Sequence, residues 1–224
     1  MLVRLALVGL FGAIGWPWLL RGNLPASKAQ RQRLLSRLAL ADDLPTLNGW
    51  VADAEFLNLV ADRILDHGAR TVVEIGSGIS TLVAARALQR CGGGTLISLD
   101  THPDHAAATA ARLGERRLAA DVRHLGYAFD PASPWGIRWT NLDQLPETID
   151  LLVVDGPPWF RHPLIRGAAD TLFDRIAPGG AILLDDAARP GERIVARRWR
   201  RAWPYVRFEH LPTMKGALLG IRRS

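Results

Sequence analysis

Residues 71–81 read Thr-Val-Val-Glu-Ile-Gly-Ser-Gly-Ile-Ser-Thr, and this stretch decides the fold. Its first five residues are apolar and β-branched apart from Glu74, which is typical of a buried parallel strand. Gly76 and Gly78 predict a sharp turn, and apolar residues at helical spacing follow it. A strand, a glycine turn and a helix place bare backbone at a helix N-terminus, where a ligand can approach it. An ordinary connection between a strand and a helix has the same pattern, so the glycines alone do not identify a ligand.

An acidic residue at a defined spacing makes this turn more specific. Residues 95–99 form a second predicted strand, and Asp100 follows it, 22 positions after Gly78. In Rossmann-type folds, an acidic residue about 20 positions after the glycines binds ribose hydroxyls. The two features together predict a site for an adenosine-containing cofactor.

Hydrophobic patterns outside this unit predict alternating strands and helices, and 224 residues fit one domain. Residues 126–146 are rich in proline and glycine and predict a long irregular connection. The alternation predicts an α/β fold of the Rossmann-like, doubly wound type, with a mostly parallel sheet, helices on both faces and an antiparallel strand at the edge. Besides the helix from residue 79, we expect helices over 26–40, 51–66, 103–113, 163–176 and 191–201, and further strands over 120–125, 149–154, 181–184, 205–210 and 217–221.

The first 25 residues predict a membrane anchor. Residues 5–20 carry no charge and lie between Arg4 and Arg21, although this is shorter than the roughly 20 residues that a spanning helix needs. Basic residues follow the segment, as is typical of the cytoplasmic side. We therefore expect a spanning or monotopic anchor with the catalytic domain in the cytoplasm; a docking helix is the alternative. The predicted organisation is an anchor over 1–25, a basic linker or helix over 26–49, and a globular domain over 50–224.

The overall charge of the chain indicates an anionic partner. The net charge is +6 and arises almost entirely from arginine, which suits a nucleic acid or a membrane surface. Because no aromatic and basic RNA-binding module is present, we do not expect a nucleic-acid partner. The basic residues within 193–201 fit either a solvated helix face or contact with phospholipid. A single cysteine, Cys91, excludes a disulfide framework and fits a reducing compartment; the oligomeric state has no signal.

Acidic residues stand at or near the ends of four predicted strands. In open α/β sheets, ligands bind in the crevice outside the carboxyl ends of the strands. One acid there can cap a helix or lie in a solvated loop, whereas acids at four strand ends indicate a binding edge. These acids are Glu74, Asp100, Asp155, Asp185 and Asp186.

Taken together, the motifs resemble a class I S-adenosylmethionine-dependent methyltransferase. The resemblance covers residues 50–221 and implies a seven-stranded sheet with one antiparallel strand. It is strongest to a bacterial branch of these enzymes. The motifs that carry it are V-V-E-I-G-S-G at 72–78, within the E-I-G-S-G-x-S-T turn, D-G-P-P at 155–158, R-x-P at 161–163, P-G-G-A-I-L-L-D-D at 178–186 and D-D-A-x-R-P-G-E at 185–192.

The resemblance implies a cofactor site along the glycine turn. Residues 76–78 would pass beneath the methionine part of S-adenosylmethionine, with Glu74 toward its ammonium group and the Ser80 hydroxyl near its carboxylate. Asp100 would hold the ribose. The family often has an acid near the adenine, where this chain has Tyr127, and we expect its ring to stack on the adenine. The predicted cofactor-binding residues are Glu74, Gly76, Ser77, Gly78, Ser80, Asp100 and Tyr127.

A divalent cation, Mg²⁺, is a further prediction from the resemblance. Catechol-type O-methyltransferases hold such a cation with three oxygen ligands, for which Asp155, Asp185 and Asp186 stand here. There the metal lowers the pKa of the substrate hydroxyl and orients it. Those relatives usually carry Asp-Asn instead of Asp-Asp. The alternative is that Asp186 caps the following helix and Asp185 pairs with Arg189.

The predicted activity is methyl transfer to an oxygen of a small-molecule, lipid or saccharide acceptor. Its candidate catalytic residues are Asp155, Arg161 and His162, with His162 as a candidate base. Arg161 and Arg189 fit either binding of an anionic substrate group or neutralisation of the acids. An NAD(P)-dependent oxidoreductase is an alternative, disfavoured because the turn lacks the third glycine of G-x-G-x-x-G. A non-catalytic, membrane-tethered nucleoside-binding protein is another, disfavoured because the acids are present.

Overall fold

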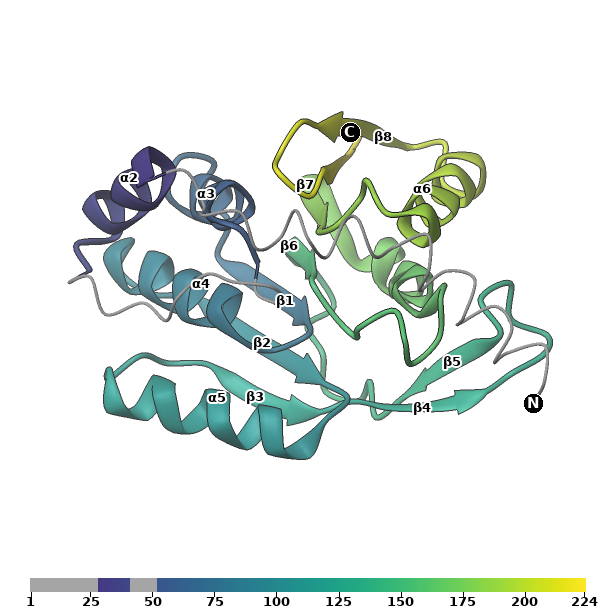
Figure 1. Cartoon of the computed structure of the whole chain (residues 1–224), viewed down its shortest axis with the longest axis horizontal. Helices are drawn as coiled ribbons and strands as arrows, with labels where there is room; N and C mark the ends of the chain where they lie inside the picture. Colours follow the sequence, from purple (N-terminus) through teal and green to yellow (C-terminus); the bar gives the residue numbers. More distant parts are fainter. Residues whose placement is uncertain (1–27, 41–51) are drawn as a thin grey trace.

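A computed structural model describes residues 28–40 and 52–224, in which helices cover both faces of one central sheet (Figure 1). Residues 1–25, with the predicted anchor or docking helix, lie outside the described residues, as do residues 41–49 of the predicted linker. Within the described part of the chain, no helix combines the length and apolar character needed to cross a membrane. The membrane anchor therefore stays a prediction.

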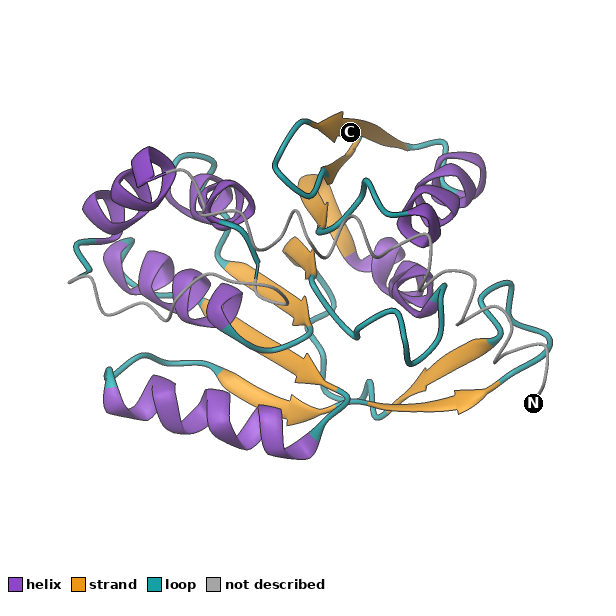
Figure 2. Cartoon of the chain, viewed as in Figure 1, coloured by secondary structure: helices purple, strands orange, loops and turns teal. Residues whose placement is uncertain are grey.

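The central sheet has seven strands in the order β3-β2-β1-β6-β7-β9-β8 (Figure 2). Strand β9 runs antiparallel to both of its neighbours, and the pairings among the first five strands are parallel. This confirms the predicted doubly wound sheet with one antiparallel strand, which lies next to the edge strand. The strands are β3 (Asp121–His124), β2 (Thr95–Asp100), β1 (Thr71–Ile75), β6 (Ile149–Val154), β7 (Ile176–Leu184), β9 (Ala217–Arg222) and β8 (Val206–Leu211).

Alternate residues of the buried strands face two separate apolar layers, as the period of a strand requires. Val72 packs with the layer that contains α2, α3 and α4, whereas Val73 packs with the layer that contains η1 and α6. The predicted covering of both faces is thus confirmed. The helices are α2 (Lys28–Leu38), α3 (Ala54–Leu65), α4 (Ile79–Arg90), α5 (Pro103–Glu115), the 3₁₀ helix η1 (Ile165–Arg175) and α6 (Pro190–Ala202).

The basic helix α2 is part of the folded core. Leu34 and Leu38 are fully buried against α3 and α4. The Arg37 guanidinium forms ion pairs with Asp62 of α3 and with Asp66, the residue that follows α3. The distance to Asp66 is 2.7 Å. The predicted helix over 26–40 is therefore confirmed over its described residues, and it packs on the domain.

Helix α6 also has two distinct faces. Its arginines lie mainly on the exposed face, while Trp199 is fully buried against Phe173 and Phe208. The Trp199 indole N–H donates to the carbonyl of Gly167 at 2.9 Å, so its one polar atom is satisfied. Truncation of such a side chain to alanine costs about 3–5 kcal/mol.

Two segments differ from the prediction. Residues 126–146 are not wholly irregular, because β4 (Gly126–Phe129) and β5 (Ile137–Thr140) form an antiparallel hairpin. Prolines and glycines gather in its turn, while Trp139 and Ile137 alternate with the exposed Arg138 as in a half-buried strand. The helix predicted over 163–176 is a 3₁₀ helix that ends at Arg175, and the expected turn at 178–180 is an irregularity within β7.

Candidate active site

A cavity of about 630 Å³ opens at the carboxyl ends of β1, β2 and β6. Its walls come from the glycine turn after β1, the start of α5, the segment after β6 and the residues before α6. This is the edge at which open α/β sheets bind ligands. The sequence prediction of a binding edge there is supported by this geometry.

The two glycines of the turn have different surroundings: neighbouring backbone leaves no room for a side chain at Gly76, whereas the space beside Gly78 is open. Gly76 has a φ of +98°, and a Cβ built on it would lie 2.4 Å from the amide nitrogen of Gly156. Only glycine therefore allows the turn after β1 to contact the turn after β6. A Cβ on Gly78 would have nothing within 4 Å, and Gly78 lines the cavity. The open space beside Gly78 is the cradle in which a ligand can contact backbone.

Asp100 joins this turn to the segment after β2. Its carboxylate accepts hydrogen bonds from the backbone N–H and the hydroxyl of Ser77, at 2.9 and 2.7 Å, and from the backbone N–H of His102 at 2.8 Å. Asp100 and Ser77 both line the cavity. The structure thus brings together the residues that the sequence predicted as the cofactor site, residues 76–78 and Asp100.

Glu74 lies behind the turn and does not line the cavity. It is 1% exposed, and its Oε2 accepts hydrogen bonds from the hydroxyls of Thr81 and of Ser98. Burial raises the pKa of Glu74 to about 7, against the effect of nearby hydroxyl donors. Among the described residues its Oε1 is buried and has no hydrogen-bond partner.

Asp155 and Ser80 meet at the other end of the cavity. Asp155 is half-buried and lines the cavity, and its Oδ2 accepts from the Ser80 hydroxyl at 3.3 Å. Burial raises the pKa of the Asp155 carboxyl above its ordinary value, although the charge of Arg166 opposes the rise. Ser80 itself is buried in the first turn of α4 and reaches the cavity only through Asp155.

Asp185 and Asp186 join Asp155 in one carboxylate cluster, with ligand atoms within 4.8 Å of one another. Burial and the two neighbouring acids raise the pKa of Asp185 well above its ordinary value. Burial also disfavours the charged form of Asp186, but Arg189 and Arg166 hold its pKa below the ordinary value. Asp186, not Asp185, pairs with Arg189, and Arg189 is the residue that precedes α6, so neither of the two predicted structural roles holds.

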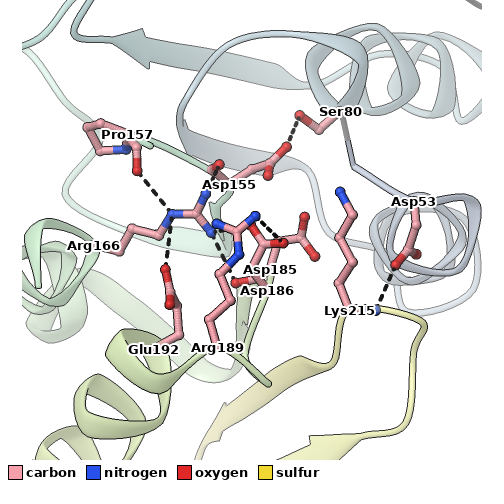
Figure 3. Close-up of polar contacts among 10 residues, drawn as sticks. All are labelled: Asp53, Ser80, Asp155, Pro157, Arg166, Asp185, Asp186, Arg189, Glu192 and Lys215. Carbon is pink, nitrogen blue, oxygen red and sulfur yellow. Dashed lines mark hydrogen bonds and ion pairs between the residues drawn. The ribbon is translucent and has the colours of Figure 1, made fainter. Parts of the chain in front are cut away.

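A buried arginine lies beside this cluster and contacts all three of its residues (Figure 3). The guanidinium of Arg166 donates to the carbonyls of Asp155 at 2.6 Å and of Asp185 at 3.1 Å, and to the carboxylate of Asp186 at 3.0 Å. A further bond runs to the carbonyl of Pro157 at 3.2 Å. Because Arg166 is 5% exposed, water does not screen these contacts.

Lys215 supports the cluster from the loop between β8 and β9. Its side chain is 5% exposed and reaches toward the carboxylates, as Figure 3 shows. Lys215 and Arg166 were not among the predicted site residues, because neither belongs to a recognisable motif. A signal existed for Lys215, since it is one of only two lysines in an arginine-rich chain.

Two predicted site residues point elsewhere. His162 packs its ring against Gly136 in the hairpin turn, and its Nδ1 accepts from the backbone N–H of Leu164, so it does not line the cavity. Tyr127 lies on β4, edge-to-face with Trp139, and does not line the cavity either. Both rings lie beside the hairpin that the sequence did not reveal, and the roles predicted for them stay predictions. Arg161 does line the cavity, as predicted.

The start of α5 contributes further residues to the cavity wall. His102 and His105 line the cavity, and their ring centroids lie 4.8 Å apart. Arg112 lies two turns further along the same helix and also lines the cavity. Their spacing of three and seven residues places them on one helix face, a pattern that could have identified them as a group.

Comparisons with known proteins agree with this geometry. Over residues 73–187 the sequence matches the family described as a methyltransferase domain. Because the match spans half of the chain, the protein belongs to this methyltransferase family, and its fold makes it a class I S-adenosylmethionine-dependent enzyme. No curated protein matches the sequence.

Solved structures share the fold at low sequence identity. A methyltransferase from Podospora anserina with bound S-adenosylhomocysteine is 15% identical, with 93% of each chain covered and a TM-score of 0.60. An O-methyltransferase from Bacillus cereus, also with S-adenosylhomocysteine, is 21% identical over 88% of this chain and 92% of that chain, with a TM-score of 0.59. The O-methyltransferase of tomaymycin synthesis from Streptomyces achromogenes is 19% identical over 88% and 91%, with a TM-score of 0.55.

The described residues fit the cofactor better than they fit the metal. The open cradle beside Gly78 and the carboxylate of Asp100 suit S-adenosylmethionine. In the carboxylate cluster, in contrast, both oxygens of Asp186 are already paired, one with Arg166 at 3.0 Å and the other with Arg189 at 2.8 Å. As arranged, this donor set does not fit a hydrated divalent cation.

Proposed function

We propose that the protein transfers the methyl group of S-adenosylmethionine to an oxygen atom of a small-molecule, lipid or saccharide acceptor. The observation that carries this proposal is the continuity of one cavity from the glycine turn and Asp100 to Asp155 and Arg161. One end suits the cofactor, and the other has a carboxylate beside space for an acceptor. The names of the Bacillus cereus and Streptomyces achromogenes structures support oxygen as the accepting atom.

The cofactor would lie along Gly76, Ser77 and Gly78, with its ribose at Asp100. When bound there, it supplies an electrophilic methyl group on a sulfonium. The glycine turn leaves room for the ligand beside Gly78, and the bonds from Ser77 and His102 hold the Asp100 carboxylate in place before the ligand arrives. A carboxylate fixed in this way loses little conformational freedom on binding.

Asp155 is the residue that we assign as proton acceptor. As the acceptor hydroxyl attacks, the new oxygen–carbon bond forms, the sulfur–carbon bond breaks, and the hydroxyl proton passes to the Asp155 carboxylate. Burial raises the pKa of Asp155, which makes its carboxylate a stronger base than one in water. The Ser80 hydroxyl donates to Oδ2 and so fixes the direction of the other oxygen. The remaining contribution is alignment of the two reactants.

Magnesium takes no part in this scheme, and the predicted cation at Asp155, Asp185 and Asp186 remains untested. Arg161 keeps its predicted place at the acceptor end of the cavity. There it can bind an anionic group of the acceptor. Arg189, in contrast, neutralises Asp186.

We also propose that residues 1–25 attach the enzyme to a membrane, with the catalytic domain on the cytoplasmic side. The support is the uncharged stretch over 5–20 and the basic residues after it. A membrane-attached enzyme could act on a lipid acceptor without releasing it into water.

The experiment that tests the function begins with calorimetric titration of the full-length protein. We expect S-adenosylmethionine and S-adenosylhomocysteine to bind and NADH not to bind. Transfer of a labelled methyl group is then measured with panels of hydroxylated and amine acceptors. Methylation of amines only would contradict the proposed acceptor atom.

Variants at Asp155 separate proton transfer from cofactor binding. Asp155→Asn should lower the rate of methyl transfer about 100-fold and leave the affinity for S-adenosylmethionine nearly unchanged, because a neutral amide cannot accept the proton. Asp104→Asn, an exposed position on α5, is the matched control. An unaltered rate in Asp155→Asn would remove Asp155 from the mechanism.

A further inference from the structure

The oxygen atoms around Arg166 form a donor set that resembles that of a cation site. Three are backbone carbonyls, from Asp155, Pro157 and Asp185, and one is a carboxylate oxygen of Asp186. Hard divalent cations bind to carbonyl and carboxylate oxygens of this kind. Here the N–H groups of a planar guanidinium make all four contacts. The ends of β6 and β7 are thus joined through an arginine.

Charge in the described part of the cluster is already nearly balanced. The buried acids Asp185, Asp186 and Glu192, together with Asp155, face the cations Arg166, Arg189 and Lys215. Arg166 Nε lies 3.9 Å from a carboxylate oxygen of Glu192, and Asp186 contacts two guanidiniums. These are four acids beside three cations, and both oxygens of Asp186 are already paired with guanidiniums. A divalent cation added here would lie beside three buried positive groups, which repel it.

We propose that the guanidinium of Arg166 takes the place of a divalent cation in this cluster, so that the enzyme binds no Mg²⁺ there. Arg166 is then a positioning residue. It holds the backbone carbonyl of Asp155, and through it the orientation of the carboxylate in the cavity. Of the three acids that predicted a metal from the sequence, Asp186 pairs with this internal cation through its carboxylate, and Asp155 and Asp185 contact it through their backbone carbonyls.

Binding of Mn²⁺ to the full-length protein, measured by electron paramagnetic resonance, tests this directly. Wild type should show no binding up to about 10 mM Mn²⁺, weaker than the weakest ordinary protein sites for such cations. Arg166→Gln removes the charge and leaves a side-chain oxygen, so it should bind Mn²⁺ at least about tenfold more tightly than wild type. Arg166→Lys keeps the charge and should stay without Mn²⁺. Submillimolar binding to wild type that Asp185→Asn abolishes would overturn the proposal.

Thermal unfolding provides a second measurement. Arg166→Gln should melt below wild type, because it leaves buried acids without their partner, and added Mg²⁺ should raise its melting temperature. Arg123→Gln, which breaks an Arg–Asp pair on β3 far from the cluster, is the matched control and should not respond to Mg²⁺. If Arg166 had a purely structural role, Mg²⁺ would not restore the melting temperature of Arg166→Gln, and that result would contradict the proposal. If Arg166→Gln does not fold, the wild-type Mn²⁺ titration decides alone.

The activity measurement rests on the proposed function, whereas the binding measurements do not. EDTA should leave methyl transfer by wild type unchanged, and loss of activity that Mg²⁺ restores would overturn the internal-cation proposal. A failure to find any methylated oxygen acceptor would count against the proposed function only. The two proposals can therefore fail separately.

Discussion

At the residue scale, the acids at the strand ends divide into two groups. Asp100 and Asp155 line the cavity, whereas Glu74 and Asp185 are almost completely buried behind it. The same residue type at equivalent strand ends thus serves both binding and internal structure. The strand period is not the cause, because the register of the sheet turns all four side chains to the same face. Depth and neighbours differ instead: Glu74 lies inside β1, and Asp185 lies beside the side chain of Lys215.

Replacing Asp100 should weaken cofactor binding more than it weakens the fold. Asp100→Asn keeps one acceptor oxygen but removes the charge, so we expect the affinity for S-adenosylmethionine to fall about tenfold or more, equivalent to about 1.4 kcal/mol. Calorimetry measures the affinity and urea unfolding the stability. An unchanged affinity would show that the ribose is not held there.

The buried Glu74 should make stability depend on pH. Its pKa is 4.5 ordinarily and about 7 in the fold. Below pH 4.5 Glu74 is protonated in both the folded and the unfolded protein. Between pH 4.5 and about 7 it is protonated only in the folded protein. The free energy of unfolding therefore falls as pH rises through this range, by about 3 kcal/mol for this group. Glu74→Gln lacks this loss. Urea unfolding at several pH values should therefore show wild type losing more stability than Glu74→Gln; parallel curves would refute the assignment.

At the element scale, the strand–turn–helix unit depends on contact between two turns. Gly76 and Gly156 touch through their backbones, so the ends of β1 and β6 are held together directly. Gly78, two residues on, precedes α4 and faces open space. The two glycines of this motif are therefore needed for different physical reasons: close backbone contact at Gly76 and open space at Gly78.

Alanine at each glycine should separate these reasons. Gly76→Ala combines a positive φ with a backbone clash and should cost about 2–3 kcal/mol or more of unfolding free energy. Gly78→Ala should cost less than about 1 kcal/mol, as expected for a helix N-cap, but its methyl group enters the cradle and should weaken S-adenosylmethionine binding. Urea unfolding and calorimetry measure the two effects. Equal loss of stability in both variants would contradict this division.

At the scale of the whole molecule, the start of α3 is tied to the C-terminal strands. Asp53 accepts from the backbone N–H of Phe56 at 2.8 Å, as a helix N-cap, and from that of Lys215 at 3.3 Å. Glu55 accepts from the backbone N–H of Met214 at 2.6 Å. The loop that carries Lys215 to the carboxylate cluster is thus positioned by a helix far away in the sequence.

Asp53→Ala should therefore lower stability by about 1–2 kcal/mol, the loss of an N-cap and a tether. Asp66→Ala, at the other end of the same helix, removes an exposed ion pair and should change it by less than about 1 kcal/mol. Urea unfolding measures both. If the two variants lose the same amount, the cap and tether at Asp53 are not important.

The N-terminal anchor is also a prediction about the whole molecule. The full-length protein should sediment with vesicles, and a variant without residues 1–25 should remain in solution, because the uncharged stretch is removed. Sedimentation with vesicles that contain anionic lipid, at low and high salt, separates apolar anchoring from attraction by the basic residues. Equal sedimentation of both proteins would contradict the anchor.

Most of the strands and helices, the glycine turn and the row of acids could be predicted from the residues alone. These follow from local rules: apolar periodicity marks buried strands, glycine permits the turn, and parallel strands bring their carboxyl ends to one edge. Asp100 and residues 76–78 could be placed on this basis.

The directions of side chains on irregular segments, in contrast, depend on how the chain packs in three dimensions. His162 and Tyr127 turn to the hairpin, and Arg166 enters the carboxylate cluster from a 3₁₀ helix. Such directions have no period in the sequence, because they result from packing between segments that are distant in the chain. The acids were visible in the sequence, but the cation that they surround was set by the fold.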